Sequence, residues 1–126
     1  MKNVTTKKTI TEIVKTFEDA LAYNGETAEQ FAHRTQFDSP DDIAIKKVKV
    51  ICLALNEGEV LQYDGKRWLY YPWFDVTGSG SGFSFYDCYY GYSHSSVGSR
   101  LCLKSSELAE YAGKQFTSEF EAALNK

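Results

Sequence analysis

Apolar and polar positions divide the chain into a helical part, a strand-like part and a final helical part. Over residues 9–24 and again over about 106–124, apolar side chains recur every three or four positions, which is the period of an amphipathic helix. Between them, over about 60–104, short aromatic and β-branched runs alternate with turn residues, as in strands. The pattern predicts an α+β fold.

The N-terminal part, about 9–57, is predicted to hold three helices. Thr9 and Thr27 each begin a capping box, in which a threonine and a Glu or Gln three residues later satisfy free backbone N–H groups. Ser39 before a proline begins the third helix. Residues 40–56 are also rich in β-branched side chains, but the length of the segment and the glycine after it favour a helix.

The middle part is predicted to form an antiparallel meander of three or four strands, with the helices packed on one of its faces. An Asp-Gly pair between the first two strands is a hairpin signal. Pro72 lacks a backbone N–H, which indicates an edge position or a bulge, and that edge is also a possible homodimer seam. The predicted strands cover residues 60–63, 67–74, 83–90 and 100–104.

Length and charge restrict the class of protein. The 126 residues match one domain, 1–126, and the net charge is −3. The N-terminus has no apolar core of a signal peptide, and no run is long enough to span a membrane. Cys52, Cys88 and Cys102 are too widely spaced for a zinc site and odd in number for a disulfide framework. We therefore expect a cytoplasmic protein without a membrane or metal association.

The strand-like part carries an unusual number of aromatic side chains. Of 19 aromatic residues in the chain, 11 lie between Trp68 and Tyr92, among many serines and glycines. Tyrosine with serine and glycine is typical of binding surfaces. The helices can cover one sheet face, so we expect exposed tyrosines on the other and a protein partner that covers them. The candidate binding residues are Trp68, Tyr71, Trp73, Tyr86, Tyr89, Tyr90, Tyr92, His94 and Arg100.

Strict alternation along the third predicted strand assigns its side chains to two faces. Phe85 and Asp87 would share one face, and Tyr86 and Cys88 the other. Both faces would carry aromatic rings, so both are expected to be at least partly covered.

Two other functions are compatible with particular residues. The first is binding of single-stranded nucleic acid, in which bases stack on aromatic rings beside a basic groove. The acidic balance of the chain and the absence of Lys and Arg from residue 68 to residue 99 count against it. The cations available for it are Lys46, Lys47, Lys49, Lys66 and Arg67.

The second alternative is a small hydrolase. His94 follows Ser93 in a sequence that resembles a nucleophile elbow, but the last glycine of that motif and an acid to orient the ring are missing. Gly78, Gly80 and Gly82 lead into a strand with no lysine, so they do not form a phosphate-binding loop. The sequence predicts no enzyme activity and no cofactor.

Five segments together resemble a family of small uncharacterised proteins from bacteriophages and integrated mobile elements of anaerobic gut bacteria. The resemblance covers the chain from about Thr11 and implies a phage-type accessory protein in a bacterial cytoplasm. It implies no activity, cofactor or binding site. The segments are KTFEDA at 15–20, ALNEG at 54–58, YYPWF at 70–74, SVGSRLC at 96–102 and ELAEYAGKQF at 107–116.

Overall fold

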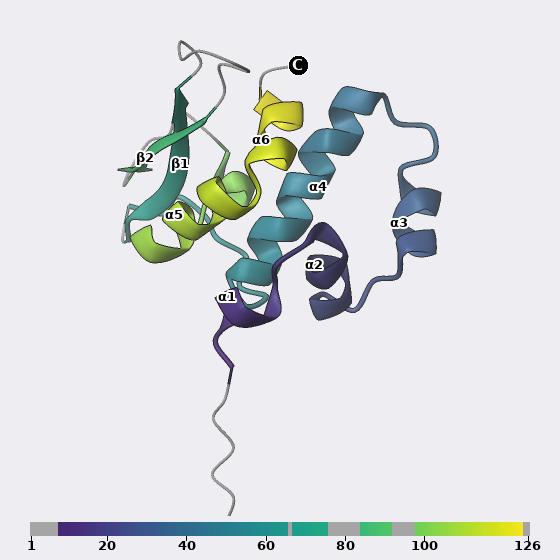
Figure 1. Cartoon of the computed structure of the whole chain (residues 1–126), viewed down its shortest axis with the longest axis horizontal. Coiled ribbons are helices and arrows are strands. Elements are labelled where there is room, and N and C mark those ends of the chain that lie inside the picture. Colours follow the sequence, from purple (N-terminus) through teal and green to yellow (C-terminus); the bar gives the residue numbers. More distant parts are fainter. Residues whose placement is uncertain (1–7, 66, 76–83, 92–97, 125–126) are drawn as a thin grey trace, which may run out of the picture.

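The computed structural model describes residues 8–65, 67–75, 84–91 and 98–124, with Ser84, Tyr89 and Gly91 described by their backbone alone. This part of the chain contains six α-helices and a two-stranded antiparallel sheet, which confirms the α+β class (Figure 1). The helices are α1 Ile10–Ile13, α2 Phe17–Tyr23, α3 Ala28–Arg34, α4 Pro40–Leu55, α5 Ser106–Gln115 and α6 Thr117–Leu124; the strands are β1 Leu69–Asp75 and β2 Ser84–Gly91, and a 3₁₀ turn, η1, covers Ser99–Leu101.

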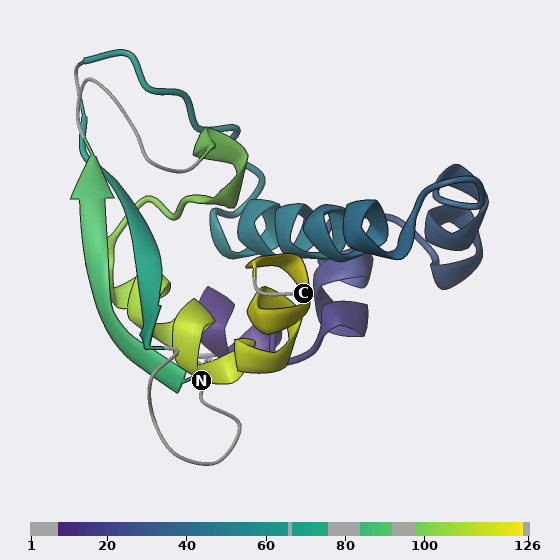
Figure 2. The ribbon, with the colours of Figure 1, turned by 90° about the horizontal axis from the view of Figure 1, so that it is seen from above.

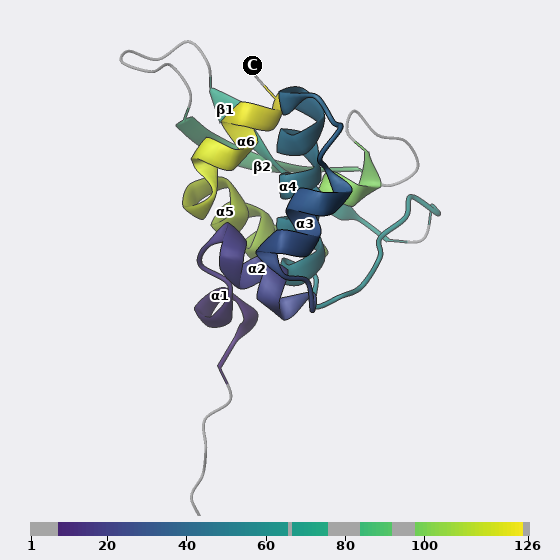
Figure 3. The same cartoon turned by 90° about the vertical axis from the view of Figure 1, so that its right-hand side faces the viewer.

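The elements are stacked in layers behind the sheet. Figure 2 shows the sheet at one side of the molecule, α5 and α6 next to it, and α4 beyond them. Helix α3 lies at the opposite side from the sheet in Figure 2, and Figure 3 shows the molecule from the α3 side, with α3 and α4 in front of the strands. The main core lies between α4, α2 and the C-terminal helices, where Ile51, Phe116 and Phe120 are buried.

The single helix predicted over 9–24 is two helices, α1 and α2. Thr16 interrupts it, because its hydroxyl accepts the Asp19 N–H at 3.0 Å while the Asp19 carboxylate accepts the Thr16 N–H at 3.2 Å. This second capping box starts a new helix in the middle of the apolar stripe. The backbone carbonyl of Val14, left free by the break, accepts the hydroxyl of Tyr111 at 2.7 Å.

Helix α4 confirms the helical interpretation of its ambiguous segment. Val48, Ile51 and Leu55, which share one helical face, have no exposed surface. Burial of this face against the other helices outweighs the modest strand preference of the β-branched residues. The Ser39 hydroxyl accepts the Asp42 N–H, so the predicted cap is confirmed as well.

Asn56, the residue at which α4 ends, connects this helix to the segment beside the sheet. The residue is buried, and its amide donates to the carbonyl of Cys102 at 2.9 Å. Its carbonyl oxygen accepts the backbone N–H of Lys104 at 2.9 Å. One side chain therefore supplies both a donor and an acceptor that β pairing would otherwise provide.

The helix predicted over about 106–124 is divided into α5 and α6 at Phe116. The hydroxyl of Thr117 donates to the carbonyl of Gly113 at 2.7 Å, which is the kind of side-chain bond that bends a helix. The bend leaves both Phe116 and Phe120 buried in the main core. The pattern of apolar positions was correct, but it did not reveal the break.

Only two of the four predicted strands occur as strands in the described residues. Residues 60–63 form no ladder, and residues 100–104 give η1 and one bridge, between Tyr70 and Leu103. The guanidinium of Arg100 donates to the Leu61 carbonyl at 2.6 Å, and the Leu61 side chain is buried against Leu69. Side-chain contacts and the single bridge therefore hold these segments, which do not form a meander of three or four strands.

The position of Pro72 follows from the hydrogen bonds of its neighbour. Tyr70 exchanges both backbone bonds with Leu103, so its polar groups point away from β2. Because these directions alternate along an antiparallel strand, the nitrogen of Pro72 also points away from β2, toward the edge of the sheet. No ladder bond is lost there, and a register shift lies next to it, between Trp73 and Phe74. The edge position predicted for Pro72 is confirmed, and the bulge lies one residue farther along, where the extra residue belongs to β2.

Candidate functional site

The register shift in the sheet determines which side chains share a face. Trp73 pairs with Asp87 and Phe74 pairs with Phe85, so Tyr86 is an extra residue in β2. A bulge of this kind places two consecutive residues opposite one on the partner strand. Strict alternation, which put Asp87 on the face of Phe85, is therefore wrong, because Tyr86 and Asp87 together oppose Trp73.

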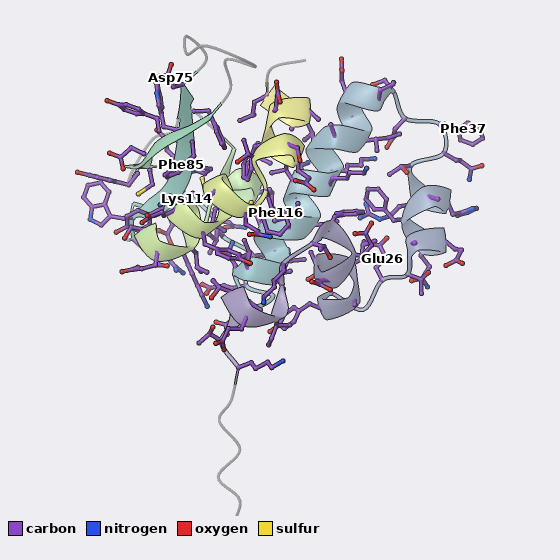
Figure 4. The ribbon with its side chains drawn as sticks, viewed as in Figure 1. Glu26, Phe37, Asp75, Phe85, Lys114 and Phe116 are labelled. Carbon is purple, nitrogen blue, oxygen red and sulfur yellow. The ribbon has the colours of Figure 1, made fainter. Side chains whose placement is uncertain are left out.

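One face of the sheet is covered by α5 and α6. Pro72 and Phe85 lie so close to Gly113 of α5 that a Cβ atom there would be 2.9 Å from the Pro72 Cβ. The Phe74 ring lies 5.3 Å from the ring of Phe120 in α6. Figure 4 shows Phe85 on the sheet and Lys114 on the helix beside it, with the Lys114 ammonium 5.7 Å from the ring centre.

The other face of the sheet is open at its centre. Trp73 is 47% exposed and Tyr86 is 63% exposed. Asp87, which follows Tyr86 and pairs with Trp73, is exposed as well. Figure 2 shows no described helix on this side of the strands. Near the Leu69 end, however, Tyr71 packs on the small cluster of Leu61, Leu69 and Cys102, so it is half-buried. We call Trp73, Tyr86 and Asp87 the outer surface.

A second group of exposed rings lies at the same end of the sheet as Leu69. The rings of Trp68 and Tyr90 are 47% and 58% exposed and meet edge to face, with centres 4.6 Å apart. Tyr70 completes the group, with its ring centre 6.0 Å from that of Tyr90. The three rings line a hollow of about 180 Å³. Sequence analysis had selected Trp68 and Tyr90 but not Tyr70.

The remaining candidates from the sequence have different positions. Arg100 does not lie among the aromatic rings, because its guanidinium bonds the Leu61 carbonyl. Tyr89 pairs with Tyr71 through the backbone. Tyr92, His94 and the serine before it lie outside the described residues.

The cations selected for nucleic-acid binding do not form one basic groove in the described residues. Lys46 is paired with Asp38 at 2.5 Å, and Arg67 is paired with Glu59. Lys47 lies over the ring of Phe17, 5.4 Å from its centre. Lys49 has no such partner in the described part of the chain, and Lys66 is outside that part.

The cysteines and a hollow between α4 and α6 offer no reactive group. Cys52 and Cys102 are fully buried and Cys88 is half-buried; burial raises the pKa of each thiol above its ordinary value, so all three stay protonated near neutral pH. A hollow of about 400 Å³ between α4 and α6 is lined by mainly small or apolar residues, among them Ile43, Ala44 and Ala122. Within residues 8–65, 67–75, 84–91 and 98–124, no three His, Cys, Asp or Glu residues come together as metal ligands.

No helix in the described part of the chain has both the length and the apolar character that a bilayer crossing requires.

At the pair formed by Pro72 and Cys88, neither edge of the sheet has a backbone N–H group that is free to bind another strand. Pro72 has none, and Cys88, which is paired with it, donates its outward N–H to the carboxylate of Asp87 at 2.8 Å. Free edge donors are what a strand from another molecule would bind, and natural sheets block them with proline and charge. Asp87, which strict alternation placed on the face of Phe85, is exposed and blocks the edge.

Replacing Asp87 with alanine is expected to increase self-association through β2, because the Cys88 N–H becomes available. One added hydrogen bond contributes about 0.5–1.5 kcal/mol, or up to about tenfold in the association constant. Sedimentation velocity of wild type and Asp87→Ala over a concentration series measures this. Asp87→Asn, which keeps an acceptor oxygen without the charge, should behave as wild type; equal association of both variants would instead assign the effect to the charge.

Sequence analysis selected Lys49 and Arg100 for different reasons and did not place them together, and it did not select Asn56. Lys49 and Arg100 line one hollow, and Asn56 bonds Cys102, although the segments are about fifty positions apart, so no local pattern indicates these contacts. The Thr16–Asp19 capping box was visible in the sequence as Thr-x-x-Asp, a variant of the box with a shorter acid.

Comparison with known proteins places the chain in no group: no protein-family model matches it, and no curated protein or solved structure does. The resemblance to proteins of phages and mobile elements therefore stays a prediction.

Proposed function

We propose that this protein is a non-enzymatic accessory protein that binds a protein partner through the outer surface of its sheet. The observation that carries the proposal is the exposure of Trp73 and Tyr86 on the face that no described helix covers. Large aromatic side chains are enriched at the energetic centres of protein interfaces, because they bury much apolar area with few rotatable bonds.

The charge around these rings favours a protein over nucleic acid. Asp87 lies between them and is exposed, and a carboxylate repels the phosphates of a bound strand. The two lysine or arginine candidates with carboxylate partners, Lys46 and Arg67, have their charges balanced within the chain. The resemblance to proteins of phages and mobile elements suggests a host or phage protein as the partner, with the proteins of host defence systems among the candidates.

The rings of Trp68 and Tyr90 form a second exposed group at one end of the sheet, on the side of Tyr70 and Pro72 and therefore not on the outer surface itself. They are held edge to face, so a partner meets a group that is already ordered. Pro72 and Asp87 block strand addition at the edges of the sheet, which directs a partner toward the face.

The proposal is tested with the double variant Trp73→Ala and Tyr86→Ala. We expect at least a tenfold loss of affinity for a partner recovered from bacterial lysate, about 1.4 kcal/mol, because two exposed rings are removed. Recovery is measured by affinity capture with mass spectrometry, and affinity by titration of the recovered protein.

Phe37→Ala is the matched control. Phe37 is 93% exposed and lies in the connection between α3 and α4, away from the sheet (Figure 4). The control should bind as wild type does. Equal binding by the double variant and the wild type would reject the outer surface, and binding of a labelled single-stranded oligonucleotide at low salt would favour the nucleic-acid alternative.

A further inference from the structure

A small notch between α4 and η1 brings together two cations from distant parts of the chain. Lys49 of α4 and Arg100 of η1 both line a hollow of about 150 Å³. Neither pairs with a carboxylate in the described part of the chain. The whole chain carries a net charge of −3, so two uncompensated positive charges in one notch are a local exception.

The guanidinium of Arg100 is held in a fixed orientation. One of its terminal nitrogens, Nη1, donates to the Leu61 carbonyl at 2.6 Å and lies 3.4 Å from the Ser99 hydroxyl. Its other two nitrogens make no hydrogen bond within the described residues. An arginine held by one nitrogen keeps a donor fork for an oxyanion without further ordering of the side chain.

The walls of the notch strengthen the attraction between the two cations and a bound anion. Leu53, Val60 and Leu61 contribute apolar surface, which lowers the local dielectric and strengthens ionic contacts. Among the described residues that line the notch, the one carboxylate is Glu59, which is paired with Arg67 and so compensates that arginine and not the two cations.

The size of the notch limits the group that it accepts. A water occupies about 30 Å³ of liquid, so the hollow holds about five waters and therefore a single small oxyanion. The side-chain amide of Asn56, which also lines the notch, bonds the carbonyl of Cys102 and the N–H of Lys104. That amide fixes the segment after η1 against the end of α4, which keeps Arg100 near Lys49.

We propose that this notch binds a phosphate group as its dianion. A phosphate monoester carries about −1.5 to −2 charges at neutral pH and three acceptor oxygens. These match the two cations, the arginine fork and the neighbouring Ser99 hydroxyl better than the single charge and two oxygens of a carboxylate do. This site is separate from the proposed contact on the outer surface, so each can fail without the other.

The test is a titration of the ¹⁵N-labelled chain with methyl phosphate, followed through the amide signals of Ser99 and Arg100 at constant ionic strength. We expect saturable shifts, and at least tenfold weaker binding in Lys49→Gln and in Arg100→Gln. Lys15→Gln is the control, because Lys15 is exposed and its side chain has no ion pair in the described residues. It should bind as wild type does.

Three further measurements separate the explanations. Lys49 makes no hydrogen bond or ion pair in the described part of the chain, so Lys49→Gln should melt as wild type does and report on the notch alone. Arg100→Lys keeps the charge but loses the fork, and intermediate binding is expected.

Inorganic phosphate in place of methyl phosphate distinguishes a free ion from an ester, and binding of either supports the notch. Acetate binding as tight as phosphate, an equal effect of Lys15→Gln, or no saturable shift with either phosphate overturns the proposal.

Discussion

Replacing Asn56 with alanine is expected to lower the free energy of unfolding by about 1–3 kcal/mol for each of the two backbone groups that it leaves without a partner. These groups are the carbonyl of Cys102 and the N–H of Lys104. Asn56 is buried, so water does not replace the lost amide without reorganisation of the end of α4. Urea denaturation followed by circular dichroism measures the change.

Asn24→Ala provides the matched control for this prediction. The same amide group in Asn24 makes one hydrogen bond, to the carbonyl of Val50 in α4, at a half-buried position. Its loss should cost about 1 kcal/mol. If both variants lose the same stability, Asn56 is an ordinary surface cap and does not connect α4 to the sheet.

Replacing Gly113 with alanine is expected to destabilise the protein by about 1–2 kcal/mol, although alanine is the better helix former by about 1 kcal/mol. A Cβ atom at this position would lie 2.6 Å from a Phe85 ring carbon and 2.9 Å from the Pro72 Cβ. The ring can turn, but Pro72 belongs to the rigid backbone of β1, so α5 and the sheet must separate. Thermal and urea denaturation of Gly113→Ala measure the cost.

Gly98→Ala is the control for Gly113, because a Cβ there meets nothing within 4 Å and its φ of −69° is one that alanine adopts freely. It should leave stability unchanged or raise it slightly. A double-mutant cycle with Phe85→Ala should recover part of the Gly113→Ala cost, because the ring is one of the two obstacles. A stabilising Gly113→Ala would show that the sheet does not rest on this helix.

The local signals in the sequence determined where helices begin. Threonine and serine caps start α2, α3, α4 and α5, because a short hydroxyl side chain can satisfy the free N–H groups of a first turn wherever it occurs. The apolar stripe of α4 correctly indicated a buried helix. Helix breaks were harder to predict. Those at Thr16 and Thr117 depend on hydrogen bonds between a side chain and the backbone, whereas the apolar pattern continues through both positions without interruption.

The aromatic surface was predictable in kind but not in detail. The density of rings indicated that some stay exposed, and Trp73 and Tyr86 confirm this. Alternation failed at Tyr86, because a bulge depends on pairing with the opposite strand. The partial burial of Tyr71 depends on Leu61, ten positions earlier, and the local sequence pattern does not indicate that contact.

The sequence by itself determined the α+β class, the starts of α1, α3, α4 and α5 and a ring-rich sheet, because these follow from side-chain period and from chemistry within a few residues. The tertiary structure decided the number of strands, the faces on which the rings lie and the placement of Lys49 and Arg100 at one notch. Each of these depends on which distant segments meet, and that is settled by packing against α4 and α5, which no window of the sequence contains.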